Sequence, residues 1–502
     1  MNMQHAMLGT EPTEKVLGVH GQPNDGSERD SKFFPLVVDL DGTLIKTDLL
    51  LESLVLLLKK NFFFLFCIPI WLLRGRQYLK LQIAQHCTIR NDLLPYNLRF
   101  LAFLKQQKEE GRTLILATAS NEKLANELAQ YVGIFSYVFA SNAEINLIGR
   151  NKAAVLVEKF GSKGFDYAGN SNADLKIWPD ARQVILVNPD VGVEKRARKI
   201  APIDMLFEER EHFLASSVRA MRVHQWLKNL LIFVPLLAAH KWGDAGSVMK
   251  AGLAFIAFSF CASAIYLLND IVDLHADRAH LRKRSRPFAS GNLPLTAGFF
   301  LIPSLSISGL LIASLVNIPF LLCLIFYIFV TSLYSFHFKS IILLDVIVLA
   351  LLYTFRVLAG AWAIDVAASF WLIAFSMLIF FSLALIKRCA ELESLKKQNR
   401  RHVKGRDYRV TDLAQLTGLG TASGIGAVII LSLYINSPET AQHYKRAQML
   451  WPLCPALLYW ICRMWVKTGR GEMHDDPIVF AAKDKTSWGV ALIVLAIFVF
   501  AL

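Results

Sequence analysis

The seven cysteines of the chain form no CxxC pair and show no spacing typical of metal ligands. Most of them lie inside apolar runs, where cysteine packs as a small hydrophobic residue, so disulfides are not expected. The first 30 residues also lack the apolar core of a signal peptide. We therefore expect the N-terminal part of the chain to stay in the cytoplasm. Residues 1–32 are polar and are expected to form a disordered tail.

Charged residues are scarce as well, at 19% of the chain against 54% hydrophobic residues. The scarcity is greatest after Trp226, where long apolar runs are separated by short basic loops. A net charge of +14 would suggest a nucleic-acid partner in a soluble protein. Here the Lys and Arg residues lie between apolar segments, which is typical of the cytoplasmic face of a membrane protein, and no nucleic acid is expected.

The length of 502 residues predicts two domains, a mixed soluble one at 33–212 and a membrane one at 213–502. Apolar stretches near the roughly 20 residues that a spanning helix needs predict an all-α bundle of about nine transmembrane helices. These stretches are 226–239, 248–269, 296–316, 318–335, 342–362, 368–388, 413–435, 448–466 and 486–502. The first is short and contains Pro235, so we expect it to be tilted or broken.

The basic loops set the expected orientation. Residues 276–295 and 387–409 are rich in Lys and Arg, whereas 362–369 has neither. Positive loops mark the cytoplasmic side of a membrane. We therefore expect an integral protein of the cytoplasmic (inner) membrane, with the N-terminal domain in the cytoplasm.

Three aspartates end the second apolar stretch. Asp270, Asp273 and Asp277 are spaced i, i+3 and i+7, which puts their carboxylates on one helical face. Three like charges at a membrane boundary are costly unless a cation neutralises them. Mg²⁺ takes carboxylates together with substrate phosphate oxygens. Because a basic run follows at 283–287, this pattern favours a site that binds a diphosphate and stabilises its departure over a solvated charge run.

The run NDIVDLHADRAHLRKRSRPFASG at 269–291 resembles the first aspartate-rich motif of the UbiA superfamily of intramembrane transferases. The run RVHQWLKN at 222–229 is similar to the opening of one branch of that superfamily. This branch transfers phosphoribose from phosphoribosyl diphosphate to decaprenyl phosphate, and the similarity extends over about 215–502. Prenyltransferases of the superfamily usually carry a second DxxxD, but here Leu349 stands four residues after Asp345. This departure favours the phosphoribosyl branch.

The resemblance implies roles for individual residues. Asp270, Asp273 and Asp277 would hold Mg²⁺ on the diphosphate donor. The implied substrate-binding residues are Lys228, Asn269, Lys283, Arg286, Lys339, Tyr353, Arg356 and Lys387. For each single basic residue, the alternative is a plain juxtamembrane anchor. The partners implied are a polyprenyl lipid, a diphosphate donor and the membrane. Transfer of a polyprenyl group to an aromatic acceptor is one alternative, and a scaffold that binds or transports an anionic lipid is another.

A second motif lies near the start of the soluble domain. Residues 33–43, FFPLVVDLDGT, read as a buried strand that ends in two carboxylates and a glycine turn. Asp39 and Asp41 share one face of the extended chain, so one carboxylate can attack phosphorus while the other moves a proton. DLDGT resembles the first motif of the haloacid dehalogenase superfamily of phosphohydrolases. That resemblance implies a Rossmann-like α/β fold.

Further residues fit the same pattern. The strand expected at 114–120 has two hydroxyl residues near its end. Thr118 is our first choice for the hydroxyl of the second motif, and Ser120 is the alternative. The implied catalytic residues are Asp39, Asp41, Thr118 and Lys152, and the implied Mg²⁺ ligands are Asp39, Asp41, Asn170 and Asp174. Residues 165–174 resemble the metal-binding loop GDSxxD, except that Asn170 replaces its first aspartate. An amide oxygen can coordinate Mg²⁺ but adds no charge. Both an active phosphatase and a degenerate domain kept for binding or docking stay open.

A helical insertion is expected between Leu44 and about Phe100, of the kind that caps such sites. Its apolar run Phe62–Leu73 is too short to span a bilayer. It fits a buried core helix, or a segment that dips into the membrane between basic flanks at 59–60 and 74–76. We favour the second interpretation because the substrate of a fused phosphatase would be a lipid.

Overall fold

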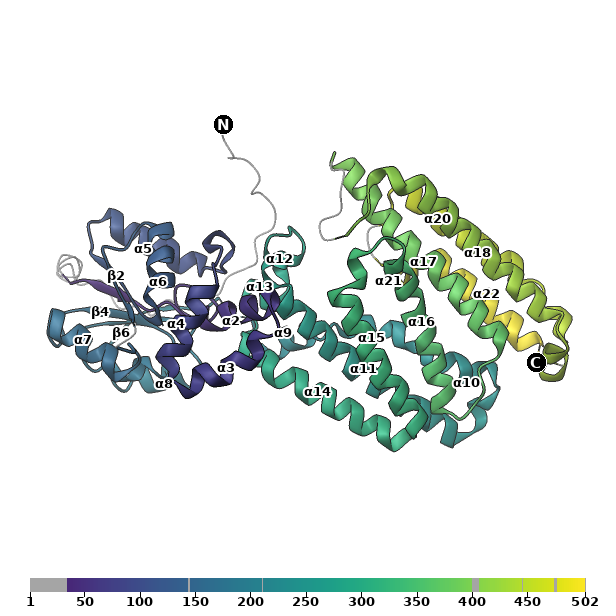
Figure 1. Cartoon of the computed structure of the whole chain (residues 1–502), viewed down its shortest axis with the longest axis horizontal. Coiled ribbons are helices and arrows are strands. Elements are labelled where there is room, and N and C mark those ends of the chain that lie inside the picture. Colours follow the sequence, from purple (N-terminus) through teal and green to yellow (C-terminus); the bar gives the residue numbers. More distant parts are fainter. Residues whose placement is uncertain are drawn as a thin grey trace, which may run out of the picture. The chain divides into compact units, whose positions relative to one another are not determined.

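The computed structural model describes residues 34–142, 145–209, 211–399, 406–444, 446–473 and 476–501 (Figure 1). The expected disordered tail at 1–32 lies outside these residues. The chain divides into two compact units, Met1–Arg210 and Glu211–Leu502.

A six-stranded parallel sheet forms the centre of unit 1, with the order β3-β2-β1-β4-β5-β6. Its strands are β1 (Leu36–Val38), β2 (Leu114–Asn121), β3 (Tyr137–Ser141), β4 (Asp166–Gly169), β5 (Val184–Val187) and β6 (Ile203–Phe207). The strands β1 and β5 are continuous apolar runs, as expected in a parallel sheet covered on both faces. The expected N-terminal α/β fold is confirmed.

Helices cover both faces of this sheet (Figure 1). They are α5 (Leu98–Glu109) and α6 (Glu122–Val132) on one face, and α7 (Arg150–Phe160) and α8 (Val193–Ala197) on the other. Side chains alternate along a strand, so Leu36 and Val38 join the core under α5 and α6, while Val37 joins the core under α7 and α8.

The insertion between β1 and α5 forms three helices, α2 (Leu49–Lys60), α3 (Phe64–Leu73) and α4 (Arg76–His86). The helices α2 and α4 share a small apolar core around Leu57 and Ile83. No residue of α3 is buried, so the interpretation of 62–73 as a buried core helix is wrong.

Unit 2 is a bundle of helices. Within the described residues, seven are long and apolar enough to cross a membrane. They lie at α11 (Ala245–Val272), α14 (Leu295–Val316), α15 (Ile318–Phe336), α16 (Leu344–Ala363), α17 (Phe370–Lys397), α18 (Leu413–Ile435) and α20 (Leu453–Gly469). An eighth span results if α21 (Pro477–Lys483) and α22 (Lys485–Ala501) are counted together, although they are bent by 85°.

The first apolar stretch does not form one continuous α-helix. It folds as the 3₁₀-helix η3 (Val223–Phe233) followed by the short α10 (Val234–Ala238). Pro235 stands in the first turn of α10, where its missing N–H costs nothing. Each of the nine predicted stretches contains helix, and the break expected in the first one is found there. Within the described residues, however, the number of spans is seven or eight and not nine, because η3 and α10 are too short to cross a membrane.

A close approach fixes η3 against α16. A Cβ atom added at Gly360 of α16 would lie 2.0 Å from the carbonyl oxygen of Ile232 in η3. Only glycine allows this spacing, as at many helix contacts in membranes. The contact brings Lys228 and Asn229 of η3 toward Tyr353 and Arg356 of α16.

Candidate functional site

The paired carboxylates of unit 1 lie at the carboxyl edge of the sheet, directly after β1. Asp39 Oδ1 accepts a hydrogen bond from Lys152 Nζ of α7 at 2.6 Å. Asp41 Oδ2 accepts one from Ser120 Oγ at 2.8 Å, and its Oδ1 accepts one from the backbone N–H of Leu49 at 2.8 Å. Neighbouring parallel strands end at the same edge, which is where ligands bind in open α/β sheets.

The two hydroxyl candidates at the end of β2 have different contacts. Thr118 is fully buried, and its Oγ1 accepts a hydrogen bond from the backbone N–H of Ser120 at 3.0 Å. Ser120, our second choice, is the residue whose hydroxyl contacts the carboxylate of Asp41. A direct role for Thr118 at the phosphoryl group stays a prediction.

The loop after β4 is tightly bonded. Asp174 Oδ2 accepts hydrogen bonds from the backbone N–H groups of Asn170 and Ser171 at 3.1 and 2.9 Å. Its Oδ1 accepts one from the hydroxyl of Tyr167, which also contacts Lys152 at 3.1 Å. Tyr167 was not predicted, because a tyrosine in an apolar strand carries no motif. It connects the lysine of α7 to the loop of Asp174.

Asn170 packs against the turn of the first motif. Its Oδ1 accepts a hydrogen bond from Thr43 Oγ1 at 3.2 Å. Gly42 has a φ of +80°, and a Cβ atom there would lie 2.3 Å from Asn170 Nδ2. The glycine of DLDGT is therefore required both by the backbone and by the amide beside it.

The pKa values of Asp39 and Asp41 differ because their surroundings differ. Burial raises the pKa of Asp39 to about 6, against the opposing effect of Lys152. Burial raises the pKa of Asp41 to about 8, and the charges of Asp48 and Asp39 add to that effect. Burial works against the charge of Lys152, but Asp39 and Asp174 hold its pKa above the usual value. At neutral pH one carboxyl is ionised and the other protonated, which suits a nucleophile beside a general acid.

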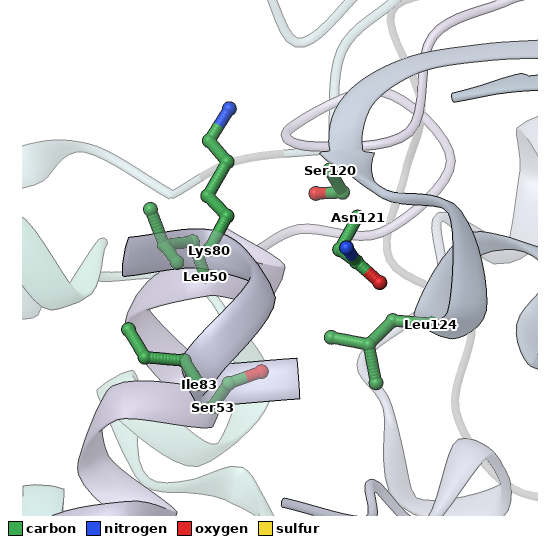
Figure 2. A pocket seen from close by; sticks show the side chains of 7 residues that line it. All are labelled: Leu50, Ser53, Lys80, Ile83, Ser120, Asn121 and Leu124. Atoms are coloured by element: carbon green, nitrogen blue, oxygen red, sulfur yellow. The ribbon is translucent and has the colours of Figure 1, made fainter. Parts of the chain in front are cut away.

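The helices α2, α3 and α4 of the insertion form a cap. A small cavity of about 10 Å³ lies between this cap and the end of β2. Figure 2 shows its lining, Leu50, Ser53, Lys80 and Ile83 from the cap and Ser120, Asn121 and Leu124 from the β2–α6 segment. Lys80 Nζ donates to the carbonyl oxygen of Ala119 at 2.7 Å and to Asn146 Oδ1 at 3.1 Å. Sequence reasoning missed Lys80, because only the fold brings α4 to this edge of the sheet.

In unit 2, the three aspartates of the first aspartate-rich motif contact basic side chains. Asp270 Oδ1, at the end of α11, accepts hydrogen bonds from Arg222 and from Arg286 Nη1, the latter at 3.1 Å. The same Nη1 lies 2.6 Å from Asp277 Oδ2 in α12 (Leu274–Arg278). Asp273 Oδ2 accepts one from Lys339 Nζ at 3.3 Å. Although α11 ends at Val272 and α12 begins at Leu274, the carboxylates of Asp270 and Asp277 share one cation, Arg286.

The donor atoms at both sites suit Mg²⁺ in kind, since they are carboxylate and amide oxygens. Within the described residues, however, no three Asp, Glu, His or Cys side chains are grouped to hold a metal ion. In unit 2, Arg286 stands between Asp270 and Asp277. In unit 1, Asp41 and Asp174 accept protein hydrogen bonds on both oxygens. Metal binding by these residues stays a prediction.

A second cluster of unit 2 surrounds Asp476, which precedes α21. Asp476 Oδ2 lies 2.6 Å from Lys228 Nζ and 3.2 Å from Lys387 Nζ. The Lys228 ammonium is 5.6 Å from the ring centroid of Tyr353. A cavity of about 10 Å³ is lined by Tyr353, Lys387 and Asp476, among others. Two lysines share one carboxylate here, so the cluster keeps a positive charge that favours an anion.

Asp476 was missed because it lies in a polar stretch between two apolar runs and belongs to no motif. Arg356 was expected to bind phosphate, but its donors are used within the protein. Arg356 Nε donates to Asn229 Oδ1 at 3.0 Å, and Nη2 donates to the hydroxyl of Tyr327 at 2.9 Å. Its guanidinium also lies 5.2 Å from the ring centroid of Tyr353. In this arrangement Arg356 positions its neighbours, and a phosphate contact stays a prediction.

The remaining sequence candidates are Asn269 and Lys283, which flank the aspartate cluster along the chain. Asn269 precedes Asp270 on α11, and Lys283 is exposed in η5 (Lys283–Ser285). Asp345 is fully buried and accepts hydrogen bonds from Arg388 and from the hydroxyl of Tyr334, the latter at 2.7 Å. The negative charge of Asp345 is thus neutralised inside the protein.

The chain matches the UbiA prenyltransferase family over residues 230–475. It is 36% identical over 476 residues to the uncharacterized protein y4nM of Sinorhizobium fredii, which covers 93% of this chain and 91% of that protein. It is 35% identical over 270 residues to the nodulation protein NoeC of Azorhizobium caulinodans, with 53% and 87% covered. The decaprenyl-phosphate phosphoribosyltransferase of Mycolicibacterium smegmatis is 29% identical over 235 residues, with 46% and 73% covered.

Similar solved structures match one unit each. A UbiA homolog from Archaeoglobus fulgidus, bound to GPP and Mg²⁺, matches 57% of this chain and 99% of its own with a TM-score of 0.44 and 16% identity. A HAD family hydrolase from Salmonella enterica matches 32% and 66% with a TM-score of 0.26 and 14% identity. From its sequence relatives and its apolar helices, the chain belongs to the UbiA prenyltransferase family and is a multi-pass integral membrane protein.

Proposed function

We propose that unit 2 transfers phosphoribose from phosphoribosyl diphosphate to a polyprenyl phosphate. The observation that carries this choice is the state of Asp345. It has no second carboxylate four residues later, and its own charge is bound by Arg388 and Tyr334. A prenyltransferase site with two acidic motifs is therefore disfavoured. The phosphoribosyltransferase relative from Mycolicibacterium supports the same choice.

The two charge clusters of unit 2 suit two phosphorylated substrates. Arg222 and Arg286, released from Asp270, would bind oxygens of the donor diphosphate through their planar forks. Lys228 and Lys387 would hold the phosphate of the lipid acceptor. A lipid phosphate oxygen forms a bond to C1 of the ribose while the bond from C1 to the diphosphate oxygen breaks. No side-chain nucleophile takes part.

Mg²⁺ bound by Asp270, Asp273 and Asp277 would neutralise charge on the departing diphosphate. The diphosphate leaves as an anion, and the lipid phosphate already carries the charge needed for attack. We place the protein in the cytoplasmic membrane with unit 1 in the cytoplasm, on the side that the basic loops predict.

We further propose that unit 1 removes the terminal 5-phosphate from the lipid product. Asp39 attacks the phosphorus, the bond from phosphorus to the sugar oxygen breaks, and Asp41 gives its proton to that oxygen. Water then attacks the aspartyl phosphate, Asp41 accepts its proton, and inorganic phosphate leaves. Lys152 stabilises the phosphoryl charge, and the separate pKa values of the two aspartates support this division of roles.

The transfer is tested with the full chain in lipid nanodiscs, supplied with Mg²⁺, labelled phosphoribosyl diphosphate and decaprenyl phosphate. The wild-type protein is expected to release diphosphate and to label the lipid. Asp277→Asn should lower that rate on the order of 100-fold or more, because a transition-state contact is lost. Asp365→Asn is the matched control, since Asp365 pairs with Lys250 on an exposed loop.

If Asp277→Asn labels the lipid at the wild-type rate, the proposed role of Asp277 in transfer is rejected. An absence of labelled lipid with the wild-type protein, together with diphosphate release from a polyprenyl diphosphate and an aromatic acceptor, would establish the prenyltransferase alternative.

A further inference from the structure

The surface of the cap carries an apolar segment that unit 1 does not cover. Phe62 is 65% exposed, Phe63 73%, Phe66 66% and Leu73 89%. The ten residues of α3, FLFCIPIWLL, contain no charged side chain, and none of them is buried. Exposed apolar patches of this kind mark a site of interaction with a partner or a membrane.

The helix is held to the cap on one side. Phe64 and Trp71 lie 5.2 and 5.9 Å from the ring of His86 in α4, centroid to centroid. The large side chains around them point outward. Apolar residues occupy every face of α3, whereas a helix that binds in a protein groove needs only one apolar stripe.

The charge around α3 has one sign. From Ser53 to Asn91 the chain has no Asp or Glu, and six cations: Lys59, Lys60, Arg74, Arg76, Lys80 and Arg90. The four nearest to α3, at 59, 60, 74 and 76, are exposed. Such a segment complements an anionic lipid surface, which attracts Lys and Arg residues close to it. A ten-residue helix is only about 15 Å long and cannot cross the bilayer.

We propose that α3, with Phe62 and Phe63, inserts into the interface of an anionic bilayer, and that its basic flanks contact lipid phosphates there. The same chain crosses the membrane through unit 2, so a bilayer is always within its reach. The contact does not depend on catalysis in unit 1. It would bring a lipid surface to the cap, whose α4 also carries Lys80 to the cavity beside Ser120.

The native Cys67 of α3 provides the test. It is partly exposed, whereas the other cysteines are buried except Cys462. In a Cys462→Ser background, Cys67 is labelled with bimane and the full chain is placed in nanodiscs that contain phosphatidylglycerol. Lipids with a doxyl group on the acyl chain should quench about half of the fluorescence, since interfacial helices lie roughly 5–10 Å deep. A label at Ala102→Cys, with Cys67 and Cys462 replaced by Ser, is the control, because Ala102 is exposed on α5.

Quenching of the Cys67 label by iodide in water, and not by doxyl lipids, would overturn the proposal. Protection from both quenchers would also overturn it, since α3 would then be covered by protein. A variant with Gln at all four basic flank positions should show less quenching of the Cys67 label by doxyl lipids; these positions are Lys59, Lys60, Arg74 and Arg76. Asp39→Asn should leave it unchanged, which separates this proposal from the hydrolase activity.

Discussion

At the residue scale, Asp39 and Asp41 show how two identical side chains, two positions apart, acquire different protonation states. Asp39 lies beside the ammonium of Lys152, which favours its ionised form. Asp41 is half-buried near other acidic groups, and its partners are a hydroxyl and a backbone N–H. The difference in environment, and not in residue type, supports the proposed division of roles, with attack by Asp39 and proton transfer by Asp41.

A pH dependence follows from these pKa values. Phosphate release from a phosphoribosylated lipid should rise as Asp39 ionises near pH 6 and fall as Asp41 loses its proton near pH 8. Single-turnover measurements between pH 5 and 10, with the phosphoribosylated lipid as the substrate, check this profile. Burial raises the pKa of Asp41, and the hydroxyl of Ser120 partly offsets it. Ser120→Ala should therefore move the alkaline limb to higher pH. If the alkaline limb of the pH profile does not move, Asp41 is not the group that transfers the proton.

The sequence predicted the residues that belong to motifs and missed those that only the fold brings to the sites. Asp39 and Lys152 were recognised from their patterns, and they meet at 2.6 Å. The choice between Thr118 and Ser120 depends on the direction of each side chain at the end of β2, which a sequence does not specify. Lys80 and Asp476 reach their sites from distant segments with no pattern of their own.

At the scale of elements, the apolar stretches predicted the seven long apolar helices of the described part of the bundle, because hydrophobic length is a strong signal. Short helices such as α12, α13 (Pro287–Ser290) and α19 (Pro438–His443) have no such signal. The continuity of the helices was harder to predict. The η3–α10 break was expected from a short stretch that contains proline, whereas the 85° bend between α21 and α22 follows from no apolar pattern. Both irregular regions contribute to the Asp476 cluster, η3 through Lys228 and the start of α21 through Asp476. Side chains of a site are often positioned by such interrupted helices in membranes.

The contact between η3 and α16 gives a prediction at this scale. Gly360→Ala would place a methyl group 2.0 Å from the carbonyl oxygen of Ile232, so η3 must move away from α16. We expect a loss of stability of about 1–3 kcal/mol and a fall in transfer on the order of 10–100-fold, because Lys228 is displaced. Gly418→Ala in α18 is the control, since nothing lies within 4 Å of its added Cβ. Thermal unfolding and diphosphate release measure the two effects. Equal behaviour of both variants would contradict the role of this contact.

At the scale of the whole molecule, two units with separate cores are joined in one chain. The relative from Sinorhizobium fredii matches along nearly the full length, so the joined arrangement is shared with it. A covalent link keeps a second activity at a high local concentration near the product of the first. The proposed product carries a terminal phosphate, which is the group that the carboxylate pair of unit 1 is suited to remove.

Asp39→Asn tests the coupling of the two units. The variant should release diphosphate at the wild-type rate, because unit 2 is untouched, while the phosphorylated lipid accumulates and inorganic phosphate is not released. Thin-layer separation of the labelled lipids, with a phosphate assay on the same samples, measures both steps. Asn170→Asp restores a carboxylate in the loop that resembles GDSxxD, and hydrolysis should be unchanged or faster. If the wild-type protein and Asp39→Asn both yield only the phosphorylated lipid, unit 1 acts as a docking or regulatory module, and the role of its carboxylate pair in hydrolysis is rejected.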